Sequence, residues 1–200
     1  MKHSMILTAA AAALTTLPAH ADPRSGGDWT GFYVGGQVGW MEVEYPTRSP
    51  AVPGGVLYDG NGSAFGFHAG YNHDFGDFVL GGEVSVDFPS VDIDITPTGR
   101  PAPREVDYFA VAKFKAGYDA GRFLPYAVIG YASQDFKDTG ALAAGSQTFD
   151  GVAYGVGVNY RVGPNLIAGV EALWFDLDPS NTSFLTSEGT MLSLRLSYKF

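Results

Sequence analysis

The sequence predicts an all-β chain that folds as one eight-stranded antiparallel up-and-down transmembrane β-barrel. Three observations predict it: alternating apolar and polar residues recur in segment after segment, an apolar leader precedes these segments, and the last segment ends on the aromatic Phe200. In that segment, 189–200, leucines and aromatics share one face while Ser, Arg and Lys share the other. Because successive strand side chains point to opposite faces, the segment suits a wall between lipid and a polar interior.

The leader, Met1 to Ala21, has the features of a signal peptide that is removed on export. A basic start precedes about a dozen apolar residues, and Ala19-His20-Ala21 offers a small-x-small cleavage site before Asp22. An anchor helix is disfavoured because a spanning helix needs about 20 apolar residues. The sequence therefore predicts a removed signal peptide, 1–21, and a β-barrel domain of the outer membrane, 22–200.

Composition narrows the function classes. No stretch after the leader reaches about 18 consecutive apolar residues, so any membrane crossing is made by strands. The formal charge of -9 argues against a nucleic-acid partner, which would require a basic surface. The chain has no Cys, and a barrel whose strands all pair with two neighbours does not need disulfides.

Eight segments alternate, and their apolar parity predicts which side chains face lipid. The segments are 30–40, 63–72, 78–88, 105–118, 123–134, 151–162, 166–176 and 189–200. Segment 123–134 is apolar on both faces. We favour Phe123, Ala127, Ile129 and Tyr131 as its outward residues, because this places aromatics at both ends.

The connections alternate between tight and long. Tight turns are expected at 72–77, 119–122 and 163–165, where Gly, Asn, Asp or Pro supplies the turn geometry. Long polar connections are expected at 41–62, 89–104, 135–150 and 177–188. Outer-membrane barrels keep short turns on the periplasmic side, so both termini are expected there. Aromatic residues gather at both ends of the segments, as two interfacial girdles require.

The inward parity collects charges of both signs in a lumen only wide enough for side chains. The expected lumenal ion-pair residues are Glu83, Lys113, Lys115, Arg161, Glu171 and Arg195. Counted from the tight turns, Glu83 matches Lys113 in height, and Glu171 matches Arg195. We therefore expect two ion-pair clusters on opposite sides of the barrel. They favour a plug of paired charges; a narrow ion path is the alternative.

Catalysis is disfavoured, and no cofactor or metal is predicted. The two histidines after the leader are His68, inward by parity, and His73, in a turn, and neither has a visible nucleophile partner. Haemin ligation by Tyr45 or Tyr58 remains an alternative. So does a divalent cation held by the Asp pairs of 92–94 and 176–178, although their spacing more simply indicates strands that continue beyond the bilayer.

Three motifs resemble the small opacity-protein-like, OmpA-type outer-membrane β-barrels of Gram-negative bacteria. They are Asp28-Trp29-Thr30-Gly31-Phe32-Tyr33-Val34-Gly35-Gly36, Gly117-Tyr118 with Arg122-Phe123-Leu124-Pro125-Tyr126, and Tyr198-Lys199-Phe200. Relatives often have Arg-x-Arg where this chain has Lys113-Phe114-Lys115. The resemblance implies that Tyr198 and Phe200 form the assembly signal read by the barrel-assembly machinery.

The resemblance also implies the surroundings of the chain. Its partners would be outer-membrane lipid and lipopolysaccharide, periplasmic chaperones and the assembly machinery, while any host or surface ligand stays unknown. We therefore expect a porin-family surface protein with a structural or surface-interaction role, not an enzyme. A haemin-binding or adhesin receptor and a small low-conductance channel are the alternatives.

Overall fold

The computed structural model describes residues 28–46, 56–95, 100–101, 104–138, 146–179 and 186–200. The expected signal peptide and much of the long connections lie outside the described residues. Within the described part no helix is long and apolar enough to cross a membrane.

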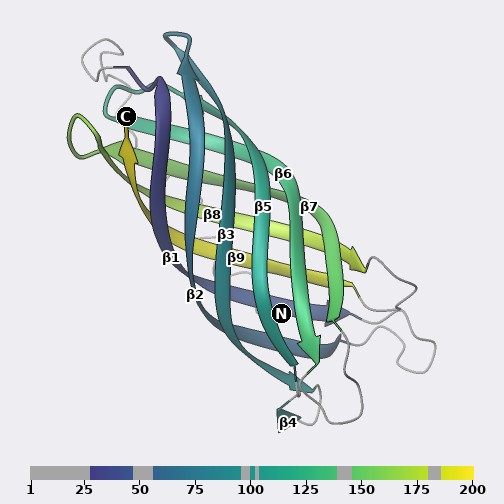
Figure 1. The fold of residues 1–200 in the computed structure, drawn as a ribbon. Helices are drawn as coiled ribbons and strands as arrows, with labels where there is room; N and C mark the ends of the chain where they lie inside the picture. Colours follow the sequence, from purple (N-terminus) through teal and green to yellow (C-terminus); the bar gives the residue numbers. More distant parts are fainter. Residues whose placement is uncertain (1–27, 47–55, 96–99, 102–103, 139–145, 180–185) are drawn as a thin grey trace.

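Eight long strands curve around a common axis (Figure 1). They are β1 (Gly31–Pro46), β2 (Val56–Asp74), β3 (Phe78–Ile95), β5 (Arg104–Tyr118), β6 (Phe123–Asp138), β7 (Ser146–Arg161), β8 (Leu166–Pro179) and β9 (Ser187–Lys199). A two-residue strand, β4 (Arg100–Pro101), pairs with the end of β3. We call the end of the barrel with the tight turns and the C-terminus the short-turn end, and the opposite end the long-loop end.

Every long strand pairs antiparallel with two neighbours, and β1 closes the sheet by pairing with both β2 and β9. Consecutive long strands are neighbours throughout the described residues, so the topology is up-and-down. Closure gives each long strand a hydrogen-bonded neighbour on both sides, which a chain surrounded by lipid requires because lipid offers no hydrogen bonds. The predicted all-β, eight-stranded antiparallel barrel is confirmed.

The strands continue farther toward the long-loop end than predicted. β1 reaches Pro46 and β3 reaches Ile95, inside the expected connections 41–62 and 89–104. The strands β6 to β9 likewise extend into 135–150 and 177–188. Alternation weakens beyond a bilayer because the outer face need no longer be apolar, whereas backbone pairing continues. The tight turns lie close to where they were predicted.

The residues predicted to face outward are exposed along most strands, and the choice made for the ambiguous segment 123–134, now β6, is confirmed. Phe123, Ile129 and Tyr131 are exposed there, whereas Leu124 and Val128 are buried in the lumen. Alternation along segment 105–118, which places Lys113 and Lys115 inside, also predicts that Asp107 faces inward, and this prediction is wrong. Asp107 is exposed, because the register between β5 and β6 shifts between Val106 and Tyr108 and makes Asp107 the extra residue of a bulge. A bulge inserts one residue and so exchanges the two faces.

Candidate functional site: the filled lumen

A network of buried ion pairs crosses the middle of the lumen. Glu83 on β3 lies 2.9 Å from Lys113, 3.1 Å from Lys115 and 2.6 Å from Arg195, measured between nitrogen and carboxylate oxygen. Glu171 on β8 pairs with Lys113 at 2.6 Å and with Arg195 at 2.5 Å. All five side chains are almost inaccessible. Buried charges are tolerated only when paired and hydrogen-bonded, and this network meets both conditions.

The expectation of two separate clusters on opposite sides of the barrel is wrong. The expected pairs Glu83–Lys113 and Glu171–Arg195 are present, but Lys113 also reaches Glu171 and Arg195 also reaches Glu83. These extra pairs join β5 to β8 and β9 to β3, strands that are not neighbours. Long side chains meet across an eight-stranded lumen because it is only wide enough to be filled by them.

Two tyrosines complete the network, which we call the lumenal ion network: Glu83, Lys113, Lys115, Glu171 and Arg195. The Tyr33 hydroxyl donates to Glu83 at 2.8 Å and accepts from Lys115 at 3.0 Å, and the Tyr126 hydroxyl donates to Glu171 at 2.9 Å. Lys115 also lies over both rings, 5.0 Å and 4.6 Å from their centroids. The rings therefore supply hydrogen bonds and an attractive face for the cation.

Inward-facing glycines make room for these rings. A Cβ on Gly70 would lie 2.4 Å from the Tyr33 hydroxyl, and one on Gly157 would lie 2.4 Å from the Tyr126 ring. Both distances are shorter than a real contact. Small residues opposite large ones are the means by which a narrow barrel fills its interior.

We expect Gly157→Ala to destabilise the folded barrel by about 1–3 kcal/mol, because the added methyl overpacks the lumen against Tyr126 and a neighbouring backbone carbonyl. Urea unfolding in lipid vesicles measures the change, with folded protein scored by its altered migration in an unheated denaturing gel. Gly36→Ala is the matched control. Its Cβ would meet nothing closer than 3.8 Å. Equal stability of the two variants would contradict the packing argument.

Arg161, the sixth residue of the expected lumenal ion-pair set, lies at the short-turn end of the barrel. Its guanidinium stacks 4.2 Å from the centroid of the Trp29 ring, at the short-turn end. Strand parity correctly places Arg161 inward. Arg161 is the last residue of β7, so it lies nearer the short-turn end than Glu171 does. The position of Arg161 along the barrel axis depends on where β7 ends, and sequence periodicity does not define strand ends sharply.

Trp29 covers the short-turn opening of the lumen. It is fully buried and packs with Val79, Leu124 and Ile167, which come from three different strands around the barrel. Its indole Nε1–H donates to Asp119 Oδ1 at 3.1 Å. We call Trp29, Val79, Leu124 and Ile167 the short-turn seal. The sequence analysis used the motif around Trp29 only for a resemblance and missed this role.

Asp119 fixes the Trp29 indole from the turn between β5 and β6. Its Oδ1 also accepts the backbone N–H of Gly121 at 2.8 Å. Burial raises the pKa of the Asp119 carboxyl, while the hydrogen bonds from Gly121 and Trp29 act in the opposite direction. On the other side, Asp74 Oδ2 accepts the Trp29 backbone N–H at 3.1 Å. The segment before β1 is thus held by two separate turns.

The long-loop half of the lumen holds many apolar side chains, which the sequence analysis did not expect. A cluster of buried side chains from seven of the eight long strands extends through it from the level of Tyr126, and we call this the long-loop seal. Its members are Met41, Val43, Ala64, Phe109, Val111, Tyr126, Val128, Ala132, Phe149, Ala153, Leu173, Phe175, Leu177 and Met191. The rings of Phe109 and Phe175 lie 4.8 Å apart. The signal was present in the sequence as apolar residues on both faces near the strand ends.

Further polar residues line the lumen between the seals. Gln37 Nε2 donates to Asp87 Oδ1 at 2.6 Å, and His68 Nε2 lies within 2.7 Å of Ser197 Oγ. His68 is buried inside the barrel, so its hydrogen bond to a serine is closed off from any substrate outside. The contact orients two inward side chains and does not form an accessible nucleophile.

The residues of the expected assembly signal lie at the short-turn end and face outward. Tyr198 and Phe200 are 51% and 70% exposed, and their rings meet edge to face at 5.3 Å. The Phe200 backbone N–H donates to the carbonyl of Phe32 at 2.9 Å. Their side chains are therefore accessible from outside the barrel.

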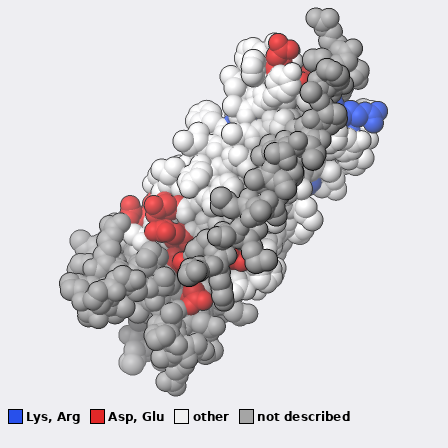
Figure 2. All heavy atoms as spheres, turned by 180° about the vertical axis from the view of Figure 1, so that it is seen from behind, with Lys and Arg blue, Asp and Glu red and all other residues white. Residues whose placement is uncertain are grey.

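The outer wall is acidic at the long-loop end. Glu188 on β9 lies directly opposite both Glu44 on β1 and Asp176 on β8. Figure 2 shows most of the visible Asp and Glu side chains at this end, lower left, and Lys and Arg toward the other. Like charges opposite one another destabilise a sheet, so this arrangement is maintained at a cost to stability. These acids form a surface on the long-loop side of the apolar belt.

Fold and lumen together define a small transmembrane β-barrel with an apolar outer belt and buried charged and apolar side chains inside. The chain belongs to the outer membrane protein beta-barrel domain family, whose model matches residues 7–200. No curated protein matched the chain.

Solved structures with the same fold include two bacterial surface proteins. One is the attachment invasion locus protein Ail of Yersinia pestis in complex with the heparin analogue sucrose octasulfate, at 14% identity and TM-score 0.51, covering 84% of this chain and 99% of that one. The other is Neisserial surface protein A, at 17% identity and TM-score 0.50, covering 86% and 98%. At these identities the likeness shows the fold alone.

Proposed function

We propose that the protein is a structural outer-membrane barrel, not an enzyme and not a channel, which stabilises the envelope and presents its long connections at the cell surface. The observation that carries this is the lumen, where the lumenal ion network lies between the short-turn seal and the long-loop seal. An eight-stranded barrel leaves little space beyond its side chains, and here charged and apolar groups occupy it in succession.

Conductance tests this proposal. Purified barrel inserted in a planar lipid bilayer is expected to show no steady single-channel current under a holding voltage. A large outer-membrane porin in the same bilayer controls for successful insertion. A stable current that scales with the amount of inserted protein would overturn the structural proposal and favour the channel alternative.

The orientation is part of the proposal: both termini in the periplasm and the long connections outside. We expect an epitope tag inserted at Gly55 or Ala143, both outside the described residues, to bind antibody on intact cells. A tag between Ala120 and Gly121, in the tight turn after β5, is expected to bind only after the outer membrane is opened. The reverse labelling pattern would invert the orientation.

A surface-interaction role is the second candidate, and the acidic outer wall favours it. The wall carries Glu42, Glu44, Asp176 and Glu188 around a hollow of about 300 Å³ beside Tyr154 and Trp174. Ail was solved with a heparin analogue, a polyanion. The acids of this chain would repel such a ligand, so the described wall favours a cationic partner.

Binding of polylysine to the barrel in neutral vesicles tests this second role. We expect binding that weakens with added salt and that falls when Glu188→Gln and Asp176→Asn are combined. Asp77→Asn, at the short-turn end, is the control. Polylysine binding that the double change does not alter would exclude the acidic wall as the contact surface.

The haemin alternative has little support among the described residues. His68 lies in the lumen and His73 at the short-turn end, so neither is at the long-loop end. Tyr45 and Tyr58 are paired across β1 and β2 near that end. Among the residues described, no group of three or more His, Cys, Asp or Glu is arranged to hold a metal.

A further inference from the structure

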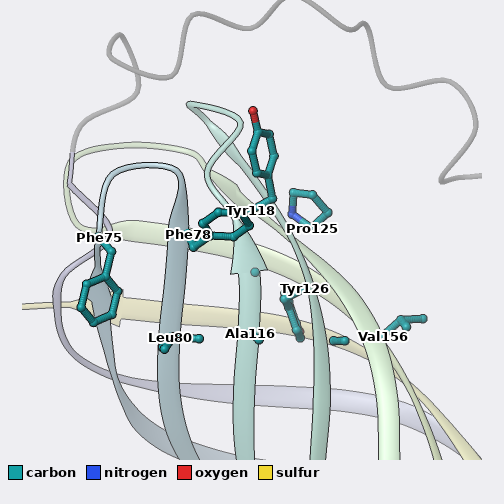
Figure 3. Close-up of a pocket in the computed structure, with 10 residues that line it drawn as sticks. Phe75, Phe78, Leu80, Ala116, Tyr118, Pro125, Tyr126 and Val156 are labelled. Atoms are coloured by element: carbon teal, nitrogen blue, oxygen red, sulfur yellow. The ribbon is translucent and has the colours of Figure 1, made fainter.

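An apolar groove of about 750 Å³ runs along the outer wall near the short-turn end, across β3, β5, β6 and β7 (Figure 3). It opens away from the barrel, so it belongs to the outer belt and not to the lumen. Phe75, Phe78, Leu80, Tyr118, Pro125 and Val156 form its sides. None of the residues that line it is charged.

The groove follows from one row of outward side chains. The register places Leu80 opposite Ala116, Ala116 opposite Ala127, and Ala127 opposite Val156. The two central members of the row are alanines, so the side chains there project from the sheet by only one methyl group. The hollow is therefore set by the sequence at positions 116 and 127.

Tall side chains bound this row of small residues. Toward the turn, the rings of Phe78 and Tyr118 meet edge to face at 6.1 Å. On the other side of the row, two residues from Ala116 and Ala127, Phe114 on β5 and Ile129 on β6 are 76% and 60% exposed. These four side chains leave a slot between two ridges of the belt, and a flexible hydrocarbon chain can lie in such a slot.

The end of the groove at the turn is polar. Figure 3 shows the Tyr118 ring directed along the strand toward the short-turn end, with its hydroxyl outermost. Arg122, in the turn that joins β5 to β6, is exposed. Asp77, in the adjacent turn, is exposed as well. A cation and an anion are thus exposed in the two turns beyond the apolar slot, and we call these turns the rim.

We propose that this groove is a binding site for one phospholipid with an ethanolamine-type headgroup. An acyl chain lies in the slot over Ala116 and Ala127, the phosphate faces Arg122 and the Tyr118 hydroxyl, and the ammonium group faces Asp77. The argument rests on charge complementarity at the rim and on the position of the slot in the lipid-facing belt. It depends on the membrane location of the chain and is independent of whether the lumen conducts.

Photolabelling tests the site. The folded protein is placed in vesicles of phosphatidylethanolamine and phosphatidylglycerol that contain a trace of phosphatidylethanolamine with a photoreactive acyl chain. After irradiation and digestion, labelled residues are located by mass spectrometry. We expect labels to concentrate on β5 and β6 around the slot, above the level on the outward face of β8 and β9. The heat-dependent gel shift verifies that each sample is folded.

Three variants sharpen the result. Ala127→Leu fills the slot and is expected to reduce labelling to the level of the rest of the belt. Ala168→Leu makes the same change at an outward position of β8, away from the slot, and is expected to have no effect. Arg122→Gln is expected to reduce labelling about fivefold, since one cation near a membrane surface contributes about 1 kcal/mol.

Several outcomes would overturn the proposal. Uniform labelling around the belt, or labelling that Ala127→Leu leaves unchanged, would show that no lipid is held. Equal labelling by a photoreactive phosphatidylglycerol would overturn the headgroup assignment. Crosslinks between two copies of the chain across the slot would show that a second barrel occupies it instead of a lipid.

Discussion

Glu83→Ala is expected to destabilise the folded barrel by about 3–5 kcal/mol, the cost of leaving buried charges without their partner. Glu83 neutralises three cations, Lys113, Lys115 and Arg195, and Glu171 pairs with only two of them. Its removal leaves three cations around one carboxylate in a lumen that water does not readily reach. Urea unfolding in lipid vesicles, followed by the gel shift, measures the loss.

Two comparisons make this test specific. Glu188→Ala removes an exposed acid of the outer wall, and such surface changes usually stay within about 0.5 kcal/mol. Glu171→Ala and Arg195→Ala should be strongly non-additive, because the double variant removes both members of a pair. Single changes of well under about 1 kcal/mol, or simple additivity, would mean that the lumen is hydrated, and the channel function would then be favoured.

The lumenal ion network shows what strand periodicity predicts and what it does not. Parity identified the inward side chains, and counting residues from the tight turns gave the heights of Glu83 and Lys113 correctly. It could not show that Lys113 also reaches Glu171 across the barrel. That contact depends on the width of the lumen and the stagger between strands, which alternation in one strand does not encode.

The long-loop seal was missed because the sequence analysis considered only the charged inward residues. Alternation along β5 places Phe109 on the same inward face as Lys113, and Phe109 is fully buried. The register shift between Val106 and Tyr108 exposes Asp107, which parity had placed inside. A bulge is a single inserted residue, so it changes the faces of a strand without altering its composition.

Tertiary hydrogen bonds, not periodicity, define the short-turn seal. Trp29 precedes β1 and carries no strand pattern of its own. Its position depends on Asp74 and Asp119, which lie 45 and 90 residues away in two different turns. Contacts between such distant positions could not be derived from one sequence, although the motif Asp28-Trp29-Thr30 drew notice by resemblance.

Trp29→Ala is expected to destabilise the barrel by about 3–5 kcal/mol, as for other fully buried tryptophans. The change removes the ring that packs on Val79, Leu124 and Ile167, and it leaves Asp119 without its indole donor. Trp29→Phe keeps most of the packing and should lose only the hydrogen bond, about 0.5–1.5 kcal/mol. Trp40→Ala is the control and should cost less, because Trp40 is a half-exposed residue of the outer belt on β1.

The same variant tests whether the two seals act in series. Trp29→Ala alone should remain non-conducting in a planar bilayer, because Phe109 and Phe175 still close the long-loop half of the lumen and the lumenal ion network still crosses its middle. Steady current from Trp29→Ala would show that the short-turn seal is the only barrier. A loss of stability no larger than that of Trp40→Ala would show instead that Trp29 contributes no more than a tryptophan exposed to lipid, and the seal would have to be abandoned.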